Sequence, residues 1–319
     1  MYAPYLRARA EELRAINDVA ALIKGGPVFP VLEPVNGTSE MWSKLRGFVK
    51  KEVPFALVVN PPYGDLSDDP KPLAAFVNEH ANANLFGGMP VMLPTFHIRP
   101  GVTPEAVEAF LKDFQGSDVG FVVASDDVPR KSFERMARGH GGVVFVAVMG
   151  RLPSSYRPNL ENAQVVKVED GFHRAPANAK YPDESFFSEL VDTYAQEGFD
   201  GFGDFATVGD LPPGGGFTPA AVVVHLSFEK APGQIRVRHF VSDDRDEQVQ
   251  GQVPRKTRQA LVKLQEFVEE NEYFQGSASS SLLDAAAGRD KLPNLGRLKR
   301  LSIRHHIELM ASVVGRKSD

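Results

Sequence analysis

The sequence predicts an α/β protein that folds as a (β/α)8 barrel. Eight short apolar runs rich in β-forming residues alternate with segments of helical spacing, which is typical of βαβ units around a parallel sheet. Most of these runs are apolar at every position, as in residues 143–148, and such strands are covered on both faces. Eight units in roughly 230 residues fit a barrel of ~250 residues. An open doubly wound sheet is the alternative, but no run is followed by a G-x-G-x-x-G turn.

The expected strands are short and have high β-propensity. They comprise residues 28–33, 55–60, 90–96, 119–124, 143–149, 163–168, 201–205 and 220–228. The run at 201–205 contains two glycines, and small residues there would let another backbone or a ligand come close.

Helices are expected between the strands, at residues 4–22, 40–50, 72–85 and 128–138. Thr103 followed by Pro104 is typical of a helix start, and the apolar residues that come next have helical spacing. Asp183 predicts the start of another helix in the same way. The segment 151–162 is too short, and contains proline, for a full helix.

The last third of the chain departs from this repeat. Residues 235–242 alternate between apolar and polar, which predicts the return strand of a hairpin with the eighth run. Amphipathic spacing predicts helices at residues 257–270 and 295–314. The serine-rich segment 276–281 and the glycine-rich segment 214–216 are expected to be loops.

Composition is that of an ordinary globular protein. Apolar residues make up 42% and charged residues 24%, which excludes a disordered chain, a coiled coil and a collagen-like fibre. We expect one domain over residues 1–319, with a barrel core at 25–230 and a hairpin and helical extension at 231–319 packed on it. No apolar run approaches the ~20 residues that cross a bilayer, and the first residues do not resemble a secretory leader. We therefore expect no membrane association and a cytoplasmic location.

Several chemistries are excluded by what the sequence lacks. It has no cysteine, which excludes disulfides, zinc–thiolate sites, iron–sulfur clusters and cysteine nucleophiles. The G-x-S-x-G elbow, the H-E-x-x-H helix and the P-loop are also absent. The formal net charge of −5 argues against general binding of nucleic acid, which needs clustered cations.

Polar side chains at the C-terminal ends of the expected strands form the candidate catalytic site, because a barrel presents those ends at one mouth. Glu33, Asp204 and His225 are the best constellation, since they lie on the first, seventh and eighth expected strands, which become neighbours when a barrel closes. His97 and Asp170 would assist them. These residues could share acid–base work, or hold a divalent metal through oxygen and nitrogen ligands.

Structural roles compete with this interpretation. His97 and His225 could be core histidines with satisfied hydrogen bonds. Asp204 is flanked by glycine and phenylalanine, and an arginine could pair with it as a structural bridge. Asp126-Asp127 is most simply a helix cap, and Asn60, before two prolines, fits turn geometry.

The last expected helix carries His305-His306-x-Glu308 and a basic run at residues 297–304. Adjacent residues do not share a helix face, so packing is favoured over a metal site. The basic run is most often a solvated helix face, and contact with a phosphate or a partner is the alternative.

Four stretches in a fixed order carry a resemblance to a known family. They are Tyr2-x-Pro4-x-Leu6-Arg7-x-Arg9 with Glu12-Leu13, Gly201-Phe202-Gly203-Asp204-Phe205, His239-Phe240-x-Ser242, and Leu301-Ser302-x-x-His305-His306-x-Glu308. Together they resemble, nearly from end to end, the beta-protein-like family named for the beta protein of a T-even bacteriophage, in particular its "sce" branch. The family pattern Arg-Asn-Ala-Asp-Tyr-Pro is here Ala-Asn-Ala-Lys-Tyr-Pro at residues 177–182, without the arginine and the aspartate.

The resemblance implies a nuclease-like companion in mobile or antiviral gene neighbourhoods, and it implies no settled chemistry. Two functions follow as hypotheses. The first is a barrel enzyme that uses acid–base or metal-assisted chemistry on a phosphorylated or nucleotide-like small molecule, which the gathered titratable groups favour. The second is a non-catalytic sensor or scaffold that docks on the nuclease-like partner through its terminal helices, which the missing arginine and aspartate favour.

Overall fold

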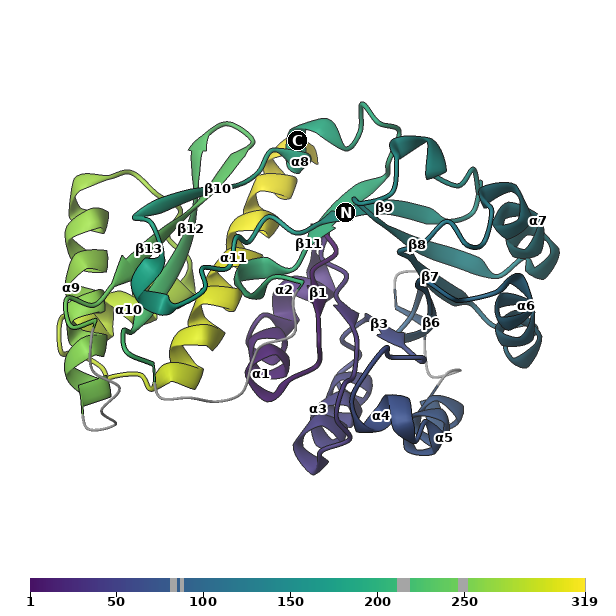
Figure 1. The fold of residues 1–319 in the computed structure, drawn as a ribbon, viewed down its shortest axis with the longest axis horizontal. Coiled ribbons are helices and arrows are strands. Elements are labelled where there is room, and N and C mark those ends of the chain that lie inside the picture. The colour runs from purple at the N-terminus through teal and green to yellow at the C-terminus, as the bar shows by residue number, and fades with distance from the viewer. Residues whose placement is uncertain (81–84, 87–88, 211–218, 246–251, 319) are drawn as a thin grey trace. The chain divides into compact units, whose positions relative to one another are not determined.

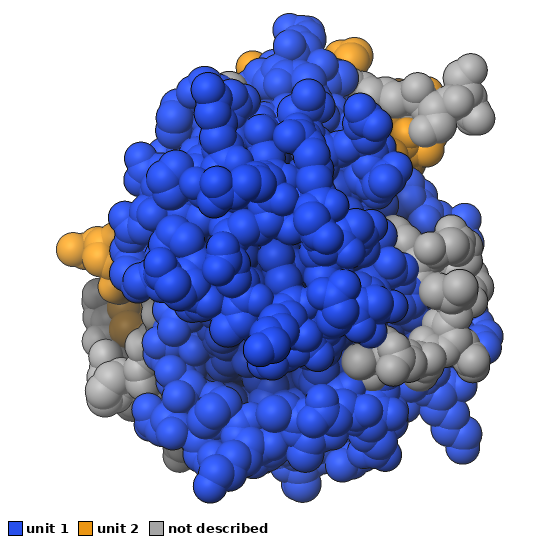
Figure 2. Space-filling model, turned by 90° about the vertical axis from the view of Figure 1, so that its right-hand side faces the viewer, with its two compact units in different colours: residues 1–169, 190–204 blue, residues 170–189, 205–319 orange. Residues whose placement is uncertain are grey.

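The computed structural model describes residues 1–80, 85–86, 89–210, 219–245 and 252–318, and the chain divides into two compact units. Unit 1 holds residues 1–169 and 190–204, and unit 2 holds residues 170–189 and 205–319. Figure 1 shows the elements of both, and Figure 2 shows the surface of unit 1 in blue. The glycine-rich segment 214–216, expected to be a loop, lies outside the described residues.

Unit 1 is a parallel eight-stranded sheet that is nearly closed into a barrel and flanked by helices, which confirms the predicted (β/α)8 class. The strand order is β1-β2-β3-β6-β7-β8-β9-β11, and an isolated parallel bridge between Tyr2 and Phe202 joins the two end strands. The strands are β1 Tyr5–Leu6, β2 Val31–Leu32, β3 Phe55–Val58, β6 Met92–Ile98, β7 Val119–Val123, β8 Val143–Met149, β9 Gln164–Glu169 and β11 Gly201–Asp204.

Helices follow most of these strands. They are α1 Ala10–Asp18, α2 Ala20–Gly25, α3 Ser39–Lys50, α4 Asp65–Asp68, α5 Lys71–His80, α6 Pro104–Asp113, α7 Arg130–His140 and α8 Leu190–Thr193. A two-stranded hairpin, β4 Leu85–Phe86 and β5 Met89–Pro90, precedes β6. Between β8 and β9 the chain forms only a short 3-10 turn, η1 Ser154–Tyr156, as the length and proline content of that segment predicted.

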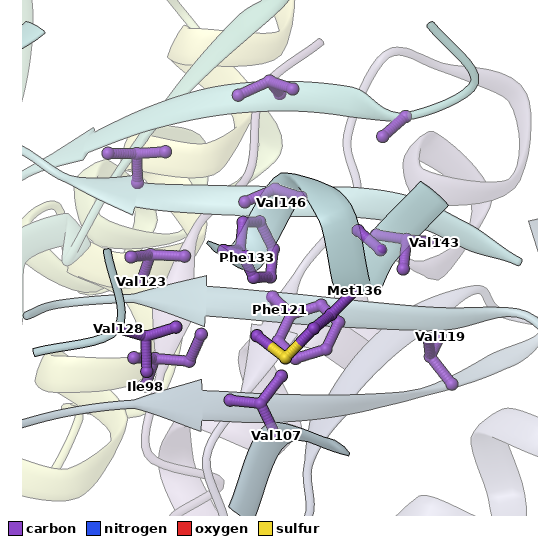
Figure 3. Packing of buried hydrophobic residues seen from close by; sticks show 14 of the residues in the cluster. Ile98, Val107, Val119, Phe121, Val123, Val128, Phe133, Met136, Val143 and Val146 are labelled. Atoms are coloured by element: carbon purple, nitrogen blue, oxygen red, sulfur yellow. The ribbon is translucent and has the colours of Figure 1, made fainter. Parts of the chain in front are cut away.

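The strands alternate between a helix-facing side and an interior side. On the helix-facing side, Phe121 and Val146 pack with Phe133 and Met136 of α7 (Figure 3). The interior side also contains aromatic rings. Phe145 of β8 makes an edge contact with Phe29, just before β2, at 5.2 Å between ring centroids. Because strand side chains alternate, this interior side continues through every second residue to the strand ends.

The seam between β1 and β11 is closed by backbone contacts. Ala3 N donates to Phe202 O at 2.8 Å, and Phe202 N donates to Met1 O at 3.0 Å. A Cβ at Gly203 would lie 2.1 Å from Ala3 O, and one at Gly201 would lie 2.5 Å from Met1 O. The two glycines are therefore required by the close approach of another backbone, which was one of the two expected alternatives.

Unit 2 is built on an antiparallel sheet of three strands in the order β10-β13-β12. The strands are β10 Glu184–Ser188, β12 Val223–Ala231 and β13 Gln234–Val241, with 3-10 turns η2 Asn178–Lys180 and η3 Ala206–Val208. The helices are α9 Val253–Glu270, α10 Ser277–Ala286 and α11 Leu295–Ser318. One sheet face packs Val224, Leu226 and Phe240 against Leu261 of α9 and Leu282 of α10.

Two expectations about the barrel strands are wrong. Residues 220–228 were expected as the eighth barrel strand, but β12 belongs to unit 2, where it pairs antiparallel with β13. The tight turn at Gly233, which has φ of 75°, makes this local pairing possible without the long crossover that a parallel neighbour requires. The eighth barrel strand is instead β1, inside the segment 4–22 that was expected to be helical throughout.

Two expectations about unit 2 are also wrong. A helix was expected after Asp183, but β10 forms there and pairs with β13. The serine-rich segment 276–281 was expected to be a loop, yet most of it is the first part of α10. Its hydroxyls are accommodated because Ser280 and Ser281 donate to carbonyls one turn earlier. Within the described ranges, none of the helices combines the length and apolarity needed to cross a membrane.

Candidate functional site

Glu33 is the centre of a buried polar cluster at the C-terminal ends of the barrel strands. It directly follows β2, and its side chain is 3% exposed. Tyr5 of β1 donates its hydroxyl to Glu33 Oε2 at 2.5 Å. Glu33 and Phe29 lie at alternate positions of one extended segment, so strand alternation places the carboxylate toward the barrel interior.

His97 of β6 meets this carboxylate from another strand. Its Nδ1 lies 3.2 Å from Glu33 Oε2, without the alignment of a full hydrogen bond. The strand β3 separates β2 from β6 in the sheet, so the contact reaches past a neighbouring strand. His97 Nε2 is buried and has no hydrogen-bond partner within the described part of the chain. Buried polar atoms of this kind call for an explanation, and a ligand is one.

The main chain of His97 is held by Asn60, which follows β3. Asn60 Oδ1 accepts from His97 N at 2.7 Å, and Asn60 Nδ2 donates to His97 O at 3.0 Å. The carbonyl of Asn60 accepts from Arg99 Nη1 at 2.7 Å. Asn60 therefore positions the histidine, a role that goes beyond the turn geometry expected for it.

Arg7 enters the cluster from the end of β1. Its Nε donates to the hydroxyl of Tyr63 and lies 3.9 Å from Glu33 Oε1. Its backbone N–H donates to Glu12 Oε2 at 2.9 Å. Ala8, the next residue, has φ of 50°, a value that turns the chain sharply out of β1. Glu12 thus fixes the short connection that carries Arg7.

The electrostatics of the cluster keep Glu33 charged. Burial alone would raise the pKa of the carboxyl, but the contacts with His97 and Tyr5 and the charge of Arg7 outweigh it, so the pKa of Glu33 lies below its ordinary value of 4.5. Burial raises the pKa of the Tyr63 hydroxyl, and the Arg7 charge only partly opposes this. At neutral pH the cluster therefore combines the ionised carboxylate of Glu33 with the protonated phenol of Tyr63.

Asp204 lies on the other side of β1, at the end of β11, and is not in contact with Glu33 or His97 in the distances above. Tyr2 donates its hydroxyl to Asp204 Oδ1 at 2.8 Å. Phe202, two residues earlier, packs its ring at 5.3 Å from the ring of Tyr194, which directly follows α8, so alternation places Asp204 on the helix-facing side. Tyr2 is therefore one buried partner of Asp204.

Asp170 and His225 both belong to unit 2. Asp170 accepts backbone N–H bonds from Phe172 at 3.0 Å and from Asp210 at 2.9 Å, which ties together two loops of that unit. His225 lies on β12 of the antiparallel sheet, so it is not on a barrel strand. The proposed neighbourhood of His225 with Glu33 and Asp204 on closing strands is therefore wrong, because the eighth barrel strand is β1.

Other polar strand ends have structural contacts. Asp127 accepts from Gly101 N at 2.6 Å and makes no hydrogen bond as a cap of α7, which begins at Arg130. The expected helix cap is thus a tie between two loops. Asp65 accepts from Gly37 N at 3.2 Å, which joins the loop after β2 to the first residue of α4.

The two histidines and the glutamate of α11 are packing residues. His305 Nε2 lies 2.8 Å from Ser227 O, and His306 Nδ1 lies 2.7 Å from Ser227 Oγ. Glu308 accepts from Ala278 N at 3.1 Å at the start of α10. Among the described residues, no three histidine, aspartate or glutamate side chains are grouped as a metal site would need.

Sequence reasoning missed Tyr5, Arg7 and Tyr63. The first two fell inside an expected helix. Two tyrosines within the first five residues favour a strand there, and this signal could have revealed them. The sequence around Tyr63 contains no comparable signal, because a tyrosine that follows prolines in a loop does not by itself indicate a functional site.

Comparison of the chain with protein-family models, with curated proteins and with solved structures returned no match. The resemblance to the beta-protein-like family therefore stays a prediction.

Proposed function

We propose that unit 1 is an acid–base enzyme that acts on a small anionic molecule of the phosphorylated or nucleotide-like class. The observation that carries this proposal is the contact between Glu33 and His97, together with the buried Nε2 of His97, which has no hydrogen-bond partner among the described residues. A carboxylate that faces one nitrogen of an imidazole orients the ring, and the other nitrogen can then exchange a proton with a bound molecule.

The charges around this pair support an anionic ligand. Arg7, Arg9 and Arg99 follow β1 and β6, and the charge of Arg9 acts on the Tyr63 hydroxyl. Arg7 Nε and His97 Nδ1 both lie close to the carboxylate of Glu33. Guanidinium groups bind phosphate through two parallel hydrogen bonds. In this proposal His97 is the general acid or base, Glu33 and Asn60 position it, and Arg9 and Arg99 hold the anion.

The experiment measures binding before turnover. Adenosine monophosphate and inorganic phosphate are titrated into the full-length protein while the ring protons of His97 are followed by NMR. Binding is expected to shift these signals and to weaken by at least roughly 10-fold in Arg9→Ala, as expected when a charged hydrogen bond is lost. Glu40→Gln, in an exposed pair with Arg14, is the control and should bind as the wild type does.

Turnover is then tested with phosphorylated metabolites and nucleotides. His97→Asn should lower any turnover by about 100-fold or more, the usual contribution of a general acid or base, while leaving anion binding largely unchanged. His97 signals that do not respond to either anion, or turnover that survives His97→Asn, would overturn the proposal.

The alternative, a non-catalytic sensor or scaffold for a nuclease-like partner in an antiviral or mobile-element operon, stays a prediction, as does the cytoplasmic location. The basic run of α11 was its expected docking surface. Arg297 pairs with Asp290 at 2.6 Å, and Arg304 pairs with Glu308 at 2.9 Å. Because these two cations have partners within their own unit, they do not favour the docking role.

A further inference from the structure

Unit 2 contains a hydrogen-bonded series of one serine and two histidines. Ser185 Oγ lies 2.8 Å from His239 Nε2, and His239 Nδ1 lies 2.8 Å from His225 Nδ1. A hydroxyl that contacts one imidazole nitrogen, with the other nitrogen held by a third group, is the arrangement that activates a serine nucleophile.

The sheet itself produces this alignment. Ser185 lies on β10, His239 on β13 and His225 on β12, the three adjacent strands of the sheet. His225 is directly opposite His239, and Ser185 is opposite Val237. Since Val237 and His239 are two residues apart, all three polar side chains share one face of the sheet. Sites built on strands hold their geometry more precisely than sites on loops.

Hydrogen-bond complementarity allows one tautomer set in which the serine is activated. If the Ser185 hydroxyl donates to His239 Nε2, the proton of His239 is on Nδ1. That N–H then donates to His225 Nδ1, whose ring carries its proton on Nε2. In this set His225 fixes both the orientation and the tautomer of His239, as the third member of a catalytic triad does.

The surroundings keep the base dry and leave the nucleophile accessible. His239 is 3% exposed, whereas Ser185 and His225 are half-buried. Tyr181 stacks on the His239 ring with centroids 4.8 Å apart, and Phe172 makes an edge contact with His225 at 5.0 Å. These two rings line the histidine pair with apolar surface.

The protonation of the pair suits a base at neutral pH. Burial, and then the neighbouring charge of Arg238, lower the pKa of His239 to about 4. Burial and the neighbouring His239 lower the pKa of His225 well below its ordinary value. Both rings are therefore neutral at pH 7, so His239 is able to accept a proton.

We propose that Ser185, His239 and His225 form a nucleophilic triad that hydrolyses small uncharged carboxylic esters. The aromatic walls and the buried base fit an uncharged substrate better than an anionic one. This activity is separate from the one proposed for unit 1, because none of the three residues belongs to that unit.

The reaction balances with water as the only co-reactant. Ser185 Oγ attacks the ester carbonyl carbon and its proton passes to His239 Nε2. The bond from the carbonyl carbon to the alkoxy oxygen then breaks, and His239 returns the proton to the leaving alcohol, which gives an acyl-serine. Water attacks this ester with His239 again as the base, and the acid and free Ser185 are released.

Covalent labelling tests the nucleophile. The full-length protein is treated with an alkyl fluorophosphonate, which forms a bond to an activated serine oxygen with loss of fluoride, and the adduct is located by peptide mass spectrometry. Wild type is expected to carry the adduct on Ser185, with hydrolysis of p-nitrophenyl acetate lost in parallel. Ser185→Ala should abolish both. Ser280→Ala is the control, because this exposed hydroxyl donates only to a helix carbonyl in the described contacts.

The histidines are tested by rate and by pH. His239→Gln should lower the labelling rate by roughly 100-fold or more, since it removes the base. The wild-type rate should be constant near neutral pH and fall as the pH is lowered through about 4, where His239 becomes protonated. His225→Gln should keep the adduct on Ser185 but displace this pH profile, which a purely structural role would not do.

Two results would overturn the proposal. One is an adduct that is absent from Ser185 in the folded wild-type protein, a result that needs no variant. The other is labelling of Ser185 that is unaffected by His239→Gln. Glu33→Gln and His97→Asn should leave the labelling of Ser185 unchanged, because both residues belong to unit 1. Failure of the triad proposal is therefore distinguished from failure of the function proposed for unit 1.

Discussion

Tyr2 donates its hydroxyl to Asp204 Oδ1 at 2.8 Å across the seam of the barrel. Both side chains are buried, with exposures of 0% and 3%. Burial, the charge of Asp204 and this hydrogen bond raise the pKa of Tyr2 well above its ordinary value, so the phenol remains a donor at every physiological pH. The pair therefore links the start of the chain to β11 in addition to the backbone bonds of the seam.

Tyr2→Phe should destabilise unit 1 by about 1–3 kcal/mol, because it removes a donor from a buried carboxylate and adds no compensating contact. Urea unfolding followed by circular dichroism measures the change. Tyr194→Phe is the matched control. The Tyr194 ring packs on Phe202, and its hydroxyl makes no hydrogen bond in the contacts described for this part of the chain. Equal effects of the two substitutions would contradict this account of the pair.

Gly203→Ala should prevent normal closure of the barrel. The added Cβ would lie 2.1 Å from Ala3 O, which is a backbone atom and cannot rotate away. We expect a loss of about 3 kcal/mol or more, in the range of severe overpacking. Gly139→Ala is the control, since its Cβ would meet nothing within 4 Å in α7, and it should stabilise slightly by its helix propensity. Thermal unfolding of the two variants measures the change in stability, and an equal stability of both would contradict the close approach at Gly203.

The sequence allowed prediction of most of the barrel but not of its first strand. Buried parallel strands such as β7 and β8 are apolar at every position, which is a strong local signal. In contrast, β1 has only two residues, Tyr5 and Leu6, and the helical spacing of the residues after it dominates any window that includes them. Its partners, β2 and β11, lie far along the chain, so the strand is determined by tertiary pairing rather than by local pattern.

The candidate site, like the barrel, was predictable only in part. Glu33 and His97 follow from the rule that polar residues at strand ends gather at one mouth, and the structure places them in contact. His225 was misplaced because an apolar run such as 222–224 does not reveal whether its partner strand is parallel or antiparallel. Ser185 was hidden for another reason: Phe186, Phe187 and later apolar residues have helical spacing, although β10 forms by pairing with β13.

Glu308→Ala should weaken the start of α10 by about 1 kcal/mol, the usual cost of a lost helix cap. The carboxylate accepts from Ala278 N at 3.1 Å and from Ser277 Oγ at 2.5 Å. Its negative charge also interacts favourably with the helix dipole at the N-terminus of α10. Hydrogen exchange of the first amides of α10 measures the effect. Glu272→Ala changes an exposed carboxylate and should leave those amides protected as in the wild type, and equal exchange in both variants would count against the cap.

Glu33→Gln should destabilise unit 1 by about 2 kcal/mol at neutral pH, because hydrogen bonds to a charged group are replaced by weaker ones. The pKa of Glu33 in the folded protein lies below 4.5, its ordinary value. A carboxyl with a lowered folded-state pKa contributes stability that is fully present above the unfolded value and is lost as the pH falls through the folded one. The difference in unfolding free energy between wild type and variant should therefore be largest above pH 4.5 and shrink below it.

Urea unfolding at a series of pH values from neutral to acidic measures this difference. Glu40→Gln provides the comparison, since its exposed pair with Arg14 at 2.7 Å should contribute less than about 1 kcal/mol at any pH. If the difference for Glu33→Gln instead grew as the pH fell below 4.5, the folded protein would hold this carboxyl in its protonated form. His97 would then face a neutral acid, and the acid–base role proposed for the pair would lose its electrostatic basis.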